Sequence, residues 1–185
     1  MTSGRIYKVE AVVLARKNVG EADRILTIFT KQYGKLRVLA KGIRRVTSKR
    51  APHAEVFSRV NMMLHRGKTN LDLVGEINPL ESYQVLRKNL EYVSAAYYLC
   101  ELVDRLLPEK QEHRDVYALL SNNLAKLNGE SQNTEYIGNE FALELLRLIG
   151  FLQKDKILKS EETEHYIESL IERRLRTPKI IRQLS

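Results

Sequence analysis

The sequence predicts an α+β protein in which a small all-β barrel is followed by a helical domain. Apolar and polar residues alternate with period two between glycine turns in the first eighty residues, which is typical of strands. Later in the chain, apolar residues recur at spacings of three and four, which is typical of helices. A chain of 185 residues with 43% hydrophobic composition can form one domain or two small ones. We expect domains over residues 1–79 and 80–185.

Five short strands are expected in the first domain. Their alternating apolar residues are, in order, Val9, Ala11, Val13 and Ala15; Leu26, Ile28 and Thr30; Leu36, Val38 and Ala40; Val60, Met62 and Leu64; and Leu71, Leu73 and Ile77. Hairpin turns are predicted at Gln32-Tyr33-Gly34 and Arg66-Gly67-Lys68. Because so many short strands cannot all leave their edges open, we expect a closed or partly closed barrel.

Four helices are expected in the second domain. The first is predicted to begin at Asn78-Pro79-Leu80-Glu81, which has the residue types of a capping box, and to stop before Pro108. The next two are indicated by two apolar stripes: Val116, Leu120, Leu124 and Leu127, ended by Gly129; and Ile137, Phe141, Leu145 and Leu148, ended by Gly150. The last is expected to run from the acidic residues near Glu161 to Arg173, Arg174 and Arg176, in keeping with the helix dipole.

Composition excludes several classes of protein. A single cysteine cannot form an internal disulfide, so a disulfide-stapled secreted scaffold is excluded. No apolar run approaches the roughly 18 residues of a membrane span, and the N-terminal residues lack a signal-peptide pattern. We therefore expect a cytoplasmic globular protein with no membrane partner.

Charge is unevenly distributed along the chain. The net charge is +8, but residues 1–80 hold 16 Lys and Arg against six Asp and Glu, whereas residues 81–185 hold 15 against 17. Between Arg24 and Ala54 there are nine basic residues and no acidic one. Such a stretch favours a face that binds an anionic polymer over a surface that is merely solvated.

The predicted strand pattern arranges these charges. Since Leu36, Val38 and Ala40 point inward, Lys35, Arg37 and Lys41 are expected to project together from the opposite face. The following loop adds further cations, so the stripe could follow a phosphate backbone. The predicted contacts are Lys35, Arg37, Lys41, Arg44, Arg45, Lys49 and Arg50, with Tyr33 as a stacking platform.

The sequence shows no catalytic signature. Its histidines (His53, His65, His113 and His165) are scattered without metal-ligand spacing, and Cys100 lies on an apolar helical stripe. The acidic residues of the basic half are not clustered as the metal ligands of a nuclease would be. We therefore expect a binding protein without enzymatic activity, metal or cofactor.

Several segments together resemble the RecO family of bacterial recombination mediators. They are Gly20-Glu21-Ala22-Asp23-Arg24, Tyr33-Gly34-Lys35, Ala40-Lys41-Gly42-Ile43-Arg44-Arg45, Ser48, Leu86-Arg87-Lys88-Asn89-Leu90, Tyr98-Leu99-Cys100-Glu101-Leu102 and Leu146-Arg147-Leu148-Ile149-Gly150-Phe151. The resemblance covers residues 5–151. It implies an N-terminal OB-fold followed by a helical domain. It also implies that Arg24, together with the basic positions above, contacts DNA.

The resemblance also implies a function in homologous recombination. The family binds single- and double-stranded DNA, anneals complementary strands coated with single-strand-binding protein, and joins RecR to load RecA. On this basis the first domain would bind nucleic acid, and the second would support the barrel and meet protein partners. The expected location is the bacterial cytoplasm, at the nucleoid when the protein acts.

One departure from the family pattern concerns zinc. Many members carry a four-cysteine insertion after the segment that ends here at Phe151, but this chain has no cysteine after Cys100. This chain therefore lacks the four cysteine ligands that would hold a zinc ion in that insertion. The shortening affects any partner surface built on the missing part, including the family's contact with the tail of single-strand-binding protein, which we keep as a partner to be tested. A general OB-fold protein that binds RNA or the ribosome is the alternative function, because it would show the same basic barrel.

Overall fold

A computed structural model describes residues 6–67, 69–129, 133–172 and 174–177. The chain forms two compact units, which we describe separately. The barrel unit comprises residues 1–82 together with Pro108–Arg114. The helical unit comprises Tyr83–Leu107 and Asp115–Ser185. None of the described helices is long and apolar enough to cross a membrane.

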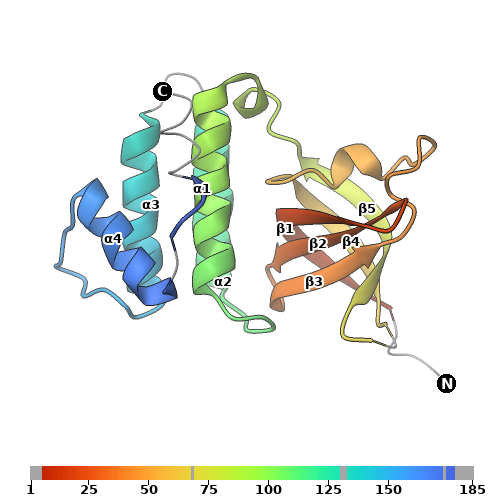
Figure 1. Ribbon diagram of the computed structural model, residues 1–185, viewed down its shortest axis with the longest axis horizontal. Coiled ribbons are helices and arrows are strands. Elements are labelled where there is room, and N and C mark those ends of the chain that lie inside the picture. Colours follow the sequence, from red (N-terminus) through yellow and green to blue (C-terminus); the bar gives the residue numbers. More distant parts are fainter. Residues whose placement is uncertain (1–5, 68, 130–132, 173, 178–185) are drawn as a thin grey trace. The chain divides into compact units, whose positions relative to one another are not determined.

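The barrel unit contains five strands that close in the order β1-β2-β3-β5-β4 (Figure 1). Their bounds are Ile6–Val19 for β1, Asp23–Thr30 for β2, Gly34–Ala40 for β3, Arg59–His65 for β4 and Asp72–Glu81 for β5, with a 3₁₀ turn, η1, at Ala51–His53. All neighbouring strands are antiparallel except β3 and β5, which pair in parallel. The prediction of an OB-fold barrel followed by helices is confirmed.

The inward faces of the five strands form one apolar core. In the β2–β3 hairpin, Leu26 pairs with Val38 and Ile28 with Leu36, and all four side chains are buried. Val60, Met62 and Leu64 of β4 complete the same core. The predicted alternation is correct for β2, β3 and β4, whose alternating apolar residues fill the barrel interior. It holds only in part for β1 and β5, because Ala15, Leu71 and Leu73 are half-buried and Val74 joins Ile77 in the core. The pairing register shifts between Val13 and Ala15 of β1 and opposite Met63 and Leu64 of β4, and such a shift changes which residues face inward.

A segment from far along the sequence belongs to the barrel unit. Pro108–Arg114, hereafter the docked segment, follows the first helix and lies against β3. Glu109 forms a parallel bridge with Lys35, and the backbone N–H of Lys110 donates to the carbonyl oxygen of Lys35 at 2.8 Å. A Cβ at Gly34 would lie 1.7 Å from the carbonyl oxygen of Gln111. Glycine is thus required where this segment meets β3.

The helical unit contains the 3₁₀ turn η2 (Leu86–Lys88) and four helices: α1 (Leu90–Leu106), α2 (Arg114–Leu127), α3 (Thr134–Leu148) and α4 (Ser160–Ile171). Helix α1 packs against α3 and α4 (Figure 1). The predicted stripes of α2 and α3 are buried apart from Leu148, which is half-buried. On α1, Ala96, Leu99 and Val103 are buried, whereas Leu90 and Tyr97 are exposed.

The predicted start of the first helix is wrong. Asn78-Pro79-Leu80-Glu81 ends β5, where Pro79 pairs with Val60 of β4 beside an irregularity in register. Proline is tolerated there because a bulge does not require its missing N–H. Pairing with β4 prevails over the local capping pattern. Helix α1 is instead capped by Asn89, whose side chain accepts from the N–H groups of Glu91 and Tyr92.

The last helix is shorter than predicted. It ends at Ile171, and Glu172 adopts a left-handed conformation with φ of 53°. Arg174 and Arg176 therefore follow the helix rather than ending it, and Arg173 lies outside the described residues. The reversal of the chain at Glu172 places the N–H groups of Arg176 and Thr177 at the carboxylate of Glu101, each at 2.8 Å.

Candidate nucleic-acid interface

The outer face of β3 displays one basic side chain. Arg37 pairs with Thr27 of β2 and is exposed, while its neighbours Leu36 and Val38 point into the core. This arrangement follows from strand geometry, since successive side chains point to opposite faces. Arg37 therefore lies where the sequence predicts it.

The loop that follows β3, residues 41–50 and hereafter the basic loop, is anchored to the barrel. Ile43 is buried in the core. The N–H of Gly42 donates to the Asp23 carboxylate at 2.7 Å, and the N–H of Arg44 donates to the carbonyl oxygen of Ala22 at 2.9 Å. These contacts join two of the sequence segments on which the resemblance to the RecO family rests. The anchoring fixes the backbone from which the basic side chains project.

Arg50 holds the other end of the basic loop. Its guanidinium donates to the carbonyl oxygens of Val74 at 2.9 Å, Gly75 at 3.1 Å and Lys41 at 2.7 Å. The side chain thereby joins β5 to the start of the loop. Its donors are engaged with backbone, so Arg50 acts in this structure as a structural residue.

Arg24 is also engaged within the barrel unit. Its side chain is 17% exposed and donates to Asn18 Oδ1 at 3.0 Å and to Glu55 Oε1 at 3.4 Å. Glu55 forms a second ion pair with Arg16. The charge of Arg24 is therefore largely compensated by neighbouring protein groups.

The expectation that Lys35 projects with Arg37 and Lys41 is wrong. Lys35 is only 8% exposed, and its backbone pairs with the docked segment. Alternation along β3 correctly places Lys35 on the outer face, but the docked segment lies alongside the strand at this point. Sequence pattern alone cannot reveal that neighbour.

Five of the eight predicted basic residues are exposed. These residues, hereafter the exposed cations, are Arg37, Lys41, Arg44, Arg45 and Lys49. Among the acidic residues near the basic loop, Asp23 is hydrogen-bonded to Gly42 and Glu55 is paired with arginines, while Glu21 is exposed. The loop and its strand thus present a local excess of positive charge, which favours binding of a phosphate backbone.

Tyr33, the predicted stacking residue, lines a pocket of about 510 Å³ in the barrel unit. Its side chain is 46% exposed. The ring of Tyr7 meets it edge to face, with centroids 5.3 Å apart and an interplanar angle of 81°. The Tyr7 hydroxyl donates to Asp72, whose other carboxylate oxygen accepts from the N–H of Gly67 at 3.0 Å. The Tyr33 ring is thus supported by Tyr7, which is itself held in place by its hydrogen bond to Asp72.

The protonation state of Tyr7 follows from its surroundings. Burial raises the pKa of the Tyr7 phenol well above its ordinary value, and the hydrogen bond to Asp72 raises it further. The phenol therefore remains a hydrogen-bond donor at neutral pH. No local sequence pattern indicates this pocket, because Tyr7 and Asp72 are 65 residues apart.

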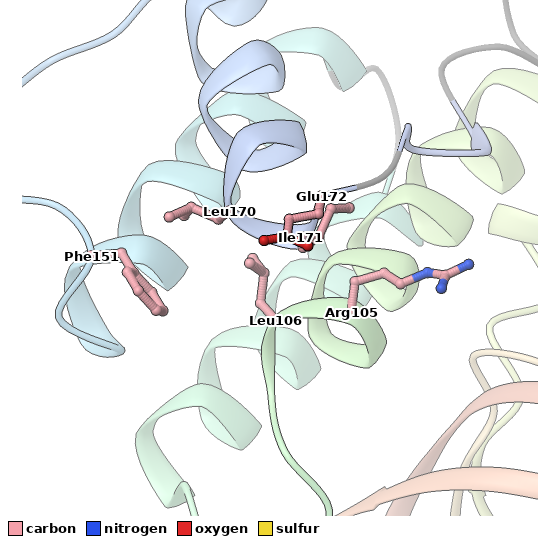
Figure 2. A pocket seen from close by; sticks show the side chains of 6 residues that line it. All are labelled: Arg105, Leu106, Phe151, Leu170, Ile171 and Glu172. Carbon is pink, nitrogen blue, oxygen red and sulfur yellow. The ribbon is translucent and has the colours of Figure 1, made fainter.

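A second pocket, of about 630 Å³, lies in the helical unit between the ends of α1 and α4 (Figure 2). Figure 2 shows Leu106 directed toward Ile171, with the guanidinium of Arg105 directed away from it. Phe151 lines the same pocket from the segment that follows α3. No sequence pattern indicated this pocket.

The described residues contain no cluster of three or more His, Cys, Asp or Glu able to hold a metal ion. Cys100 is buried in α1. Burial raises the pKa of its thiol, and the charge of Asp104 adds to the effect. The thiol is therefore un-ionised at neutral pH, which suits the core position that the sequence predicts.

Comparison with known proteins identifies the family. Residues 1–83 match the N-terminal domain of recombination protein O, and residues 87–152 match its C-terminal domain. Curated relatives named DNA repair protein RecO include those of Roseiflexus sp. strain RS-1, 38% identical over 147 residues, and Pelotomaculum thermopropionicum, 32% identical over 147 residues. A third, from Symbiobacterium thermophilum, is 34% identical over 146 residues.

The matches cover most of this chain but a smaller share of each relative. They span 80%, 80% and 79% of this chain and 51%, 56% and 57% of the three relatives, respectively. The chain therefore spans about half the length of the curated relatives that it matches. The family match does not favour the alternative of a general RNA- or ribosome-binding protein. Both family domains are matched in order over most of the sequence, and the chain belongs to the RecO family.

Proposed function

We propose that this protein binds single- and double-stranded DNA through the exposed cations, without sequence specificity. The observation that carries this proposal is the group of five cations on β3 and one anchored loop. Each phosphate neutralised by such a cation releases condensed counterions, which supplies affinity that does not depend on base identity. Anchoring of the loop reduces the conformational entropy that would be lost on binding.

The finer steps of the proposed function come from the family. We propose that the protein anneals complementary strands and, with RecR, promotes RecA loading on DNA coated by single-strand-binding protein. Contacts to phosphates leave base edges available for pairing, so they are compatible with annealing. In this proposal residues 1–79 bind DNA, residues 80–185 support the barrel and contact protein partners, and no catalytic step is involved.

A triple charge reversal tests where DNA binds. Replacing Arg37, Lys41 and Arg44 together with Glu should weaken binding to every DNA sequence by at least about 100-fold at low salt, because three attractive groups become repulsive. Fluorescence anisotropy with labelled single strands and duplexes measures the effect. Urea unfolding should change by no more than about 0.5 kcal/mol each for Arg37 and Lys41, whose side chains are exposed. Arg44 should add about 1 kcal/mol, because its exposed guanidinium donates to the carbonyl oxygen of Gly20 at 3.2 Å.

The matched control reverses three exposed cations of the helical unit, Lys126, Lys154 and Arg174, to Glu. It changes net charge by the same amount, so it separates a local site from a general charge effect. If the control abolished binding while the barrel reversal left it intact, the proposed site would be wrong. Annealing of complementary strands coated with single-strand-binding protein, with matched RNA as competitor, tests the remaining steps.

A further inference from the structure

The pocket beside Tyr33 is an open hollow with the dimensions of a small-ligand site. Its volume of about 510 Å³ lies within the range of ligand pockets in general, roughly 300 to 1,000 Å³. It combines an exposed aromatic ring with two cations, Arg66 and Lys110, and two acids, Asp72 and Glu112. The two acids disfavour binding of a phosphate inside the pocket. An uncharged aromatic ring of a ligand, by contrast, is compatible with both the acids and the cations.

The Tyr33 ring is held in place by its surroundings. Tyr7 supports it edge to face, and the Tyr33 N–H donates to Thr30 Oγ1 at 2.9 Å, which fixes the turn. Thr30 Oγ1 donates in turn to the carbonyl oxygen of Gly34 at 2.9 Å. A ring that is exposed yet already oriented loses little entropy when a second ring stacks on it.

The position of Tyr33 relates the pocket to the proposed DNA path. Tyr33 immediately precedes β3, and Arg37 lies four residues further along, about 13 Å for an extended strand. The docked segment covers β3 at Lys35, between these two residues, and contributes Lys110 to the pocket. A single strand whose phosphates follow the exposed cations to Arg37 would pass this segment before it reaches the turn. Arg66 and Lys110 line the pocket and could meet the phosphates that flank an inserted base.

We propose that this pocket accepts one unstacked nucleobase of a single strand, which stacks on the ring of Tyr33. The inference rests on the proposed function and deepens it, because it makes part of the affinity specific for single strands. Stacking is tolerant of base identity, since every base has a π-face. Duplex DNA, whose bases remain stacked in the helix, is bound by the exposed cations alone.

The test compares three ligands of equal length: a base-bearing single strand, a fully abasic single strand and a duplex. Tyr33→Ala should weaken binding of the base-bearing strand by about 5-fold or more, and change binding of the other two by less than about 2-fold. Tyr33→Phe, which keeps the ring, should bind all three as the unmodified protein does. Tyr136→Ala, an exposed tyrosine of the helical unit, is the matched control.

Three outcomes would contradict the inference. They are unchanged affinity of Tyr33→Ala for the base-bearing strand, an equal loss of affinity for the abasic strand, and weakened binding of the base-bearing strand by Tyr33→Phe. Tyr33→Leu keeps apolar bulk against Tyr7 without an aromatic face, so it reports on stacking even if Tyr33→Ala disturbs folding. The triple reversal at Arg37, Lys41 and Arg44 separates the two proposals. If it weakens binding to all three ligands while Tyr33 variants have no effect, the base pocket alone is wrong.

Discussion

At Gly34 and Lys35, β3 lies against the docked segment, whereas from Arg37 onward it leads into the exposed basic loop. Both ends of the strand are basic in sequence, and both follow the same alternation. Lys35 is nevertheless buried and Arg37 exposed. The difference arises from Pro108–Arg114, which pairs with the backbone of Lys35 and closely approaches Gly34.

A second contrast lies within the basic loop itself. Arg50 donates to three carbonyl oxygens, while Arg45 is exposed. In our proposal, an arginine of this loop either binds DNA, as Arg45 does, or holds the protein backbone that presents other arginines, as Arg50 does. Hydrogen-bond partners, rather than charge in the sequence, distinguish the two roles.

The largest expected effect is a loss of stability caused by a substitution that breaks the contact between β3 and the docked segment. Gly34→Ala should lower the free energy of unfolding by about 3 kcal/mol or more, because it combines a positive φ of 67° with a direct clash at Gln111. Gly20→Ala is the control, since Gly20 has a φ of 56° but an added Cβ there would have no neighbouring atom within 4 Å. That variant should cost about 1 to 2 kcal/mol. Urea unfolding monitored by circular dichroism measures both, and equal losses would contradict the docking contact.

An intermediate effect should separate the two arginines of the basic loop. Arg50→Met should lower the free energy of unfolding by about 1 to 2 kcal/mol, because three carbonyl groups lose a charged donor at a partly exposed site. Arg45→Met should change it by less than about 0.5 kcal/mol and should instead weaken DNA binding. If Arg45→Met proved the more destabilising of the two, the assignment of roles would be reversed.

The smallest effect concerns the salt dependence of single-strand binding. Lys41→Met should reduce the slope of log affinity against log salt by about 0.7, because one phosphate contact is lost. Lys35→Met should leave the slope unchanged, since the buried side chain of Lys35 does not face the DNA in our proposal. Anisotropy titrations at several salt concentrations measure both slopes. An equal reduction in the two variants would show that Lys35 also contacts phosphate.

Local sequence pattern determines much of this protein. Alternation at Leu36, Val38 and Ala40 is sufficient to predict β3 and the outward direction of Arg37, because strand geometry permits little else. The apolar spacing from Val116 to Leu127 similarly predicts α2 and its buried stripe. The acid-free stretch also indicates the strand and loop on which the exposed cations lie.

Tertiary structure decides what local pattern leaves open. The capping signal at Asn78 and Pro79 is overridden by pairing of β5 with β4, since a completed ladder stabilises more than one local cap. The burial of Lys35, the anchoring of Arg50 and the support of Tyr33 by Tyr7 all involve groups distant in sequence. Sequence by itself determines which residues face outward along regular strands and helices, because that depends on local backbone geometry. Register shifts in β1 and β5 change the faces there. Only the folded chain decides which of them are then covered or hydrogen-bonded, because the covering groups come from elsewhere in the chain.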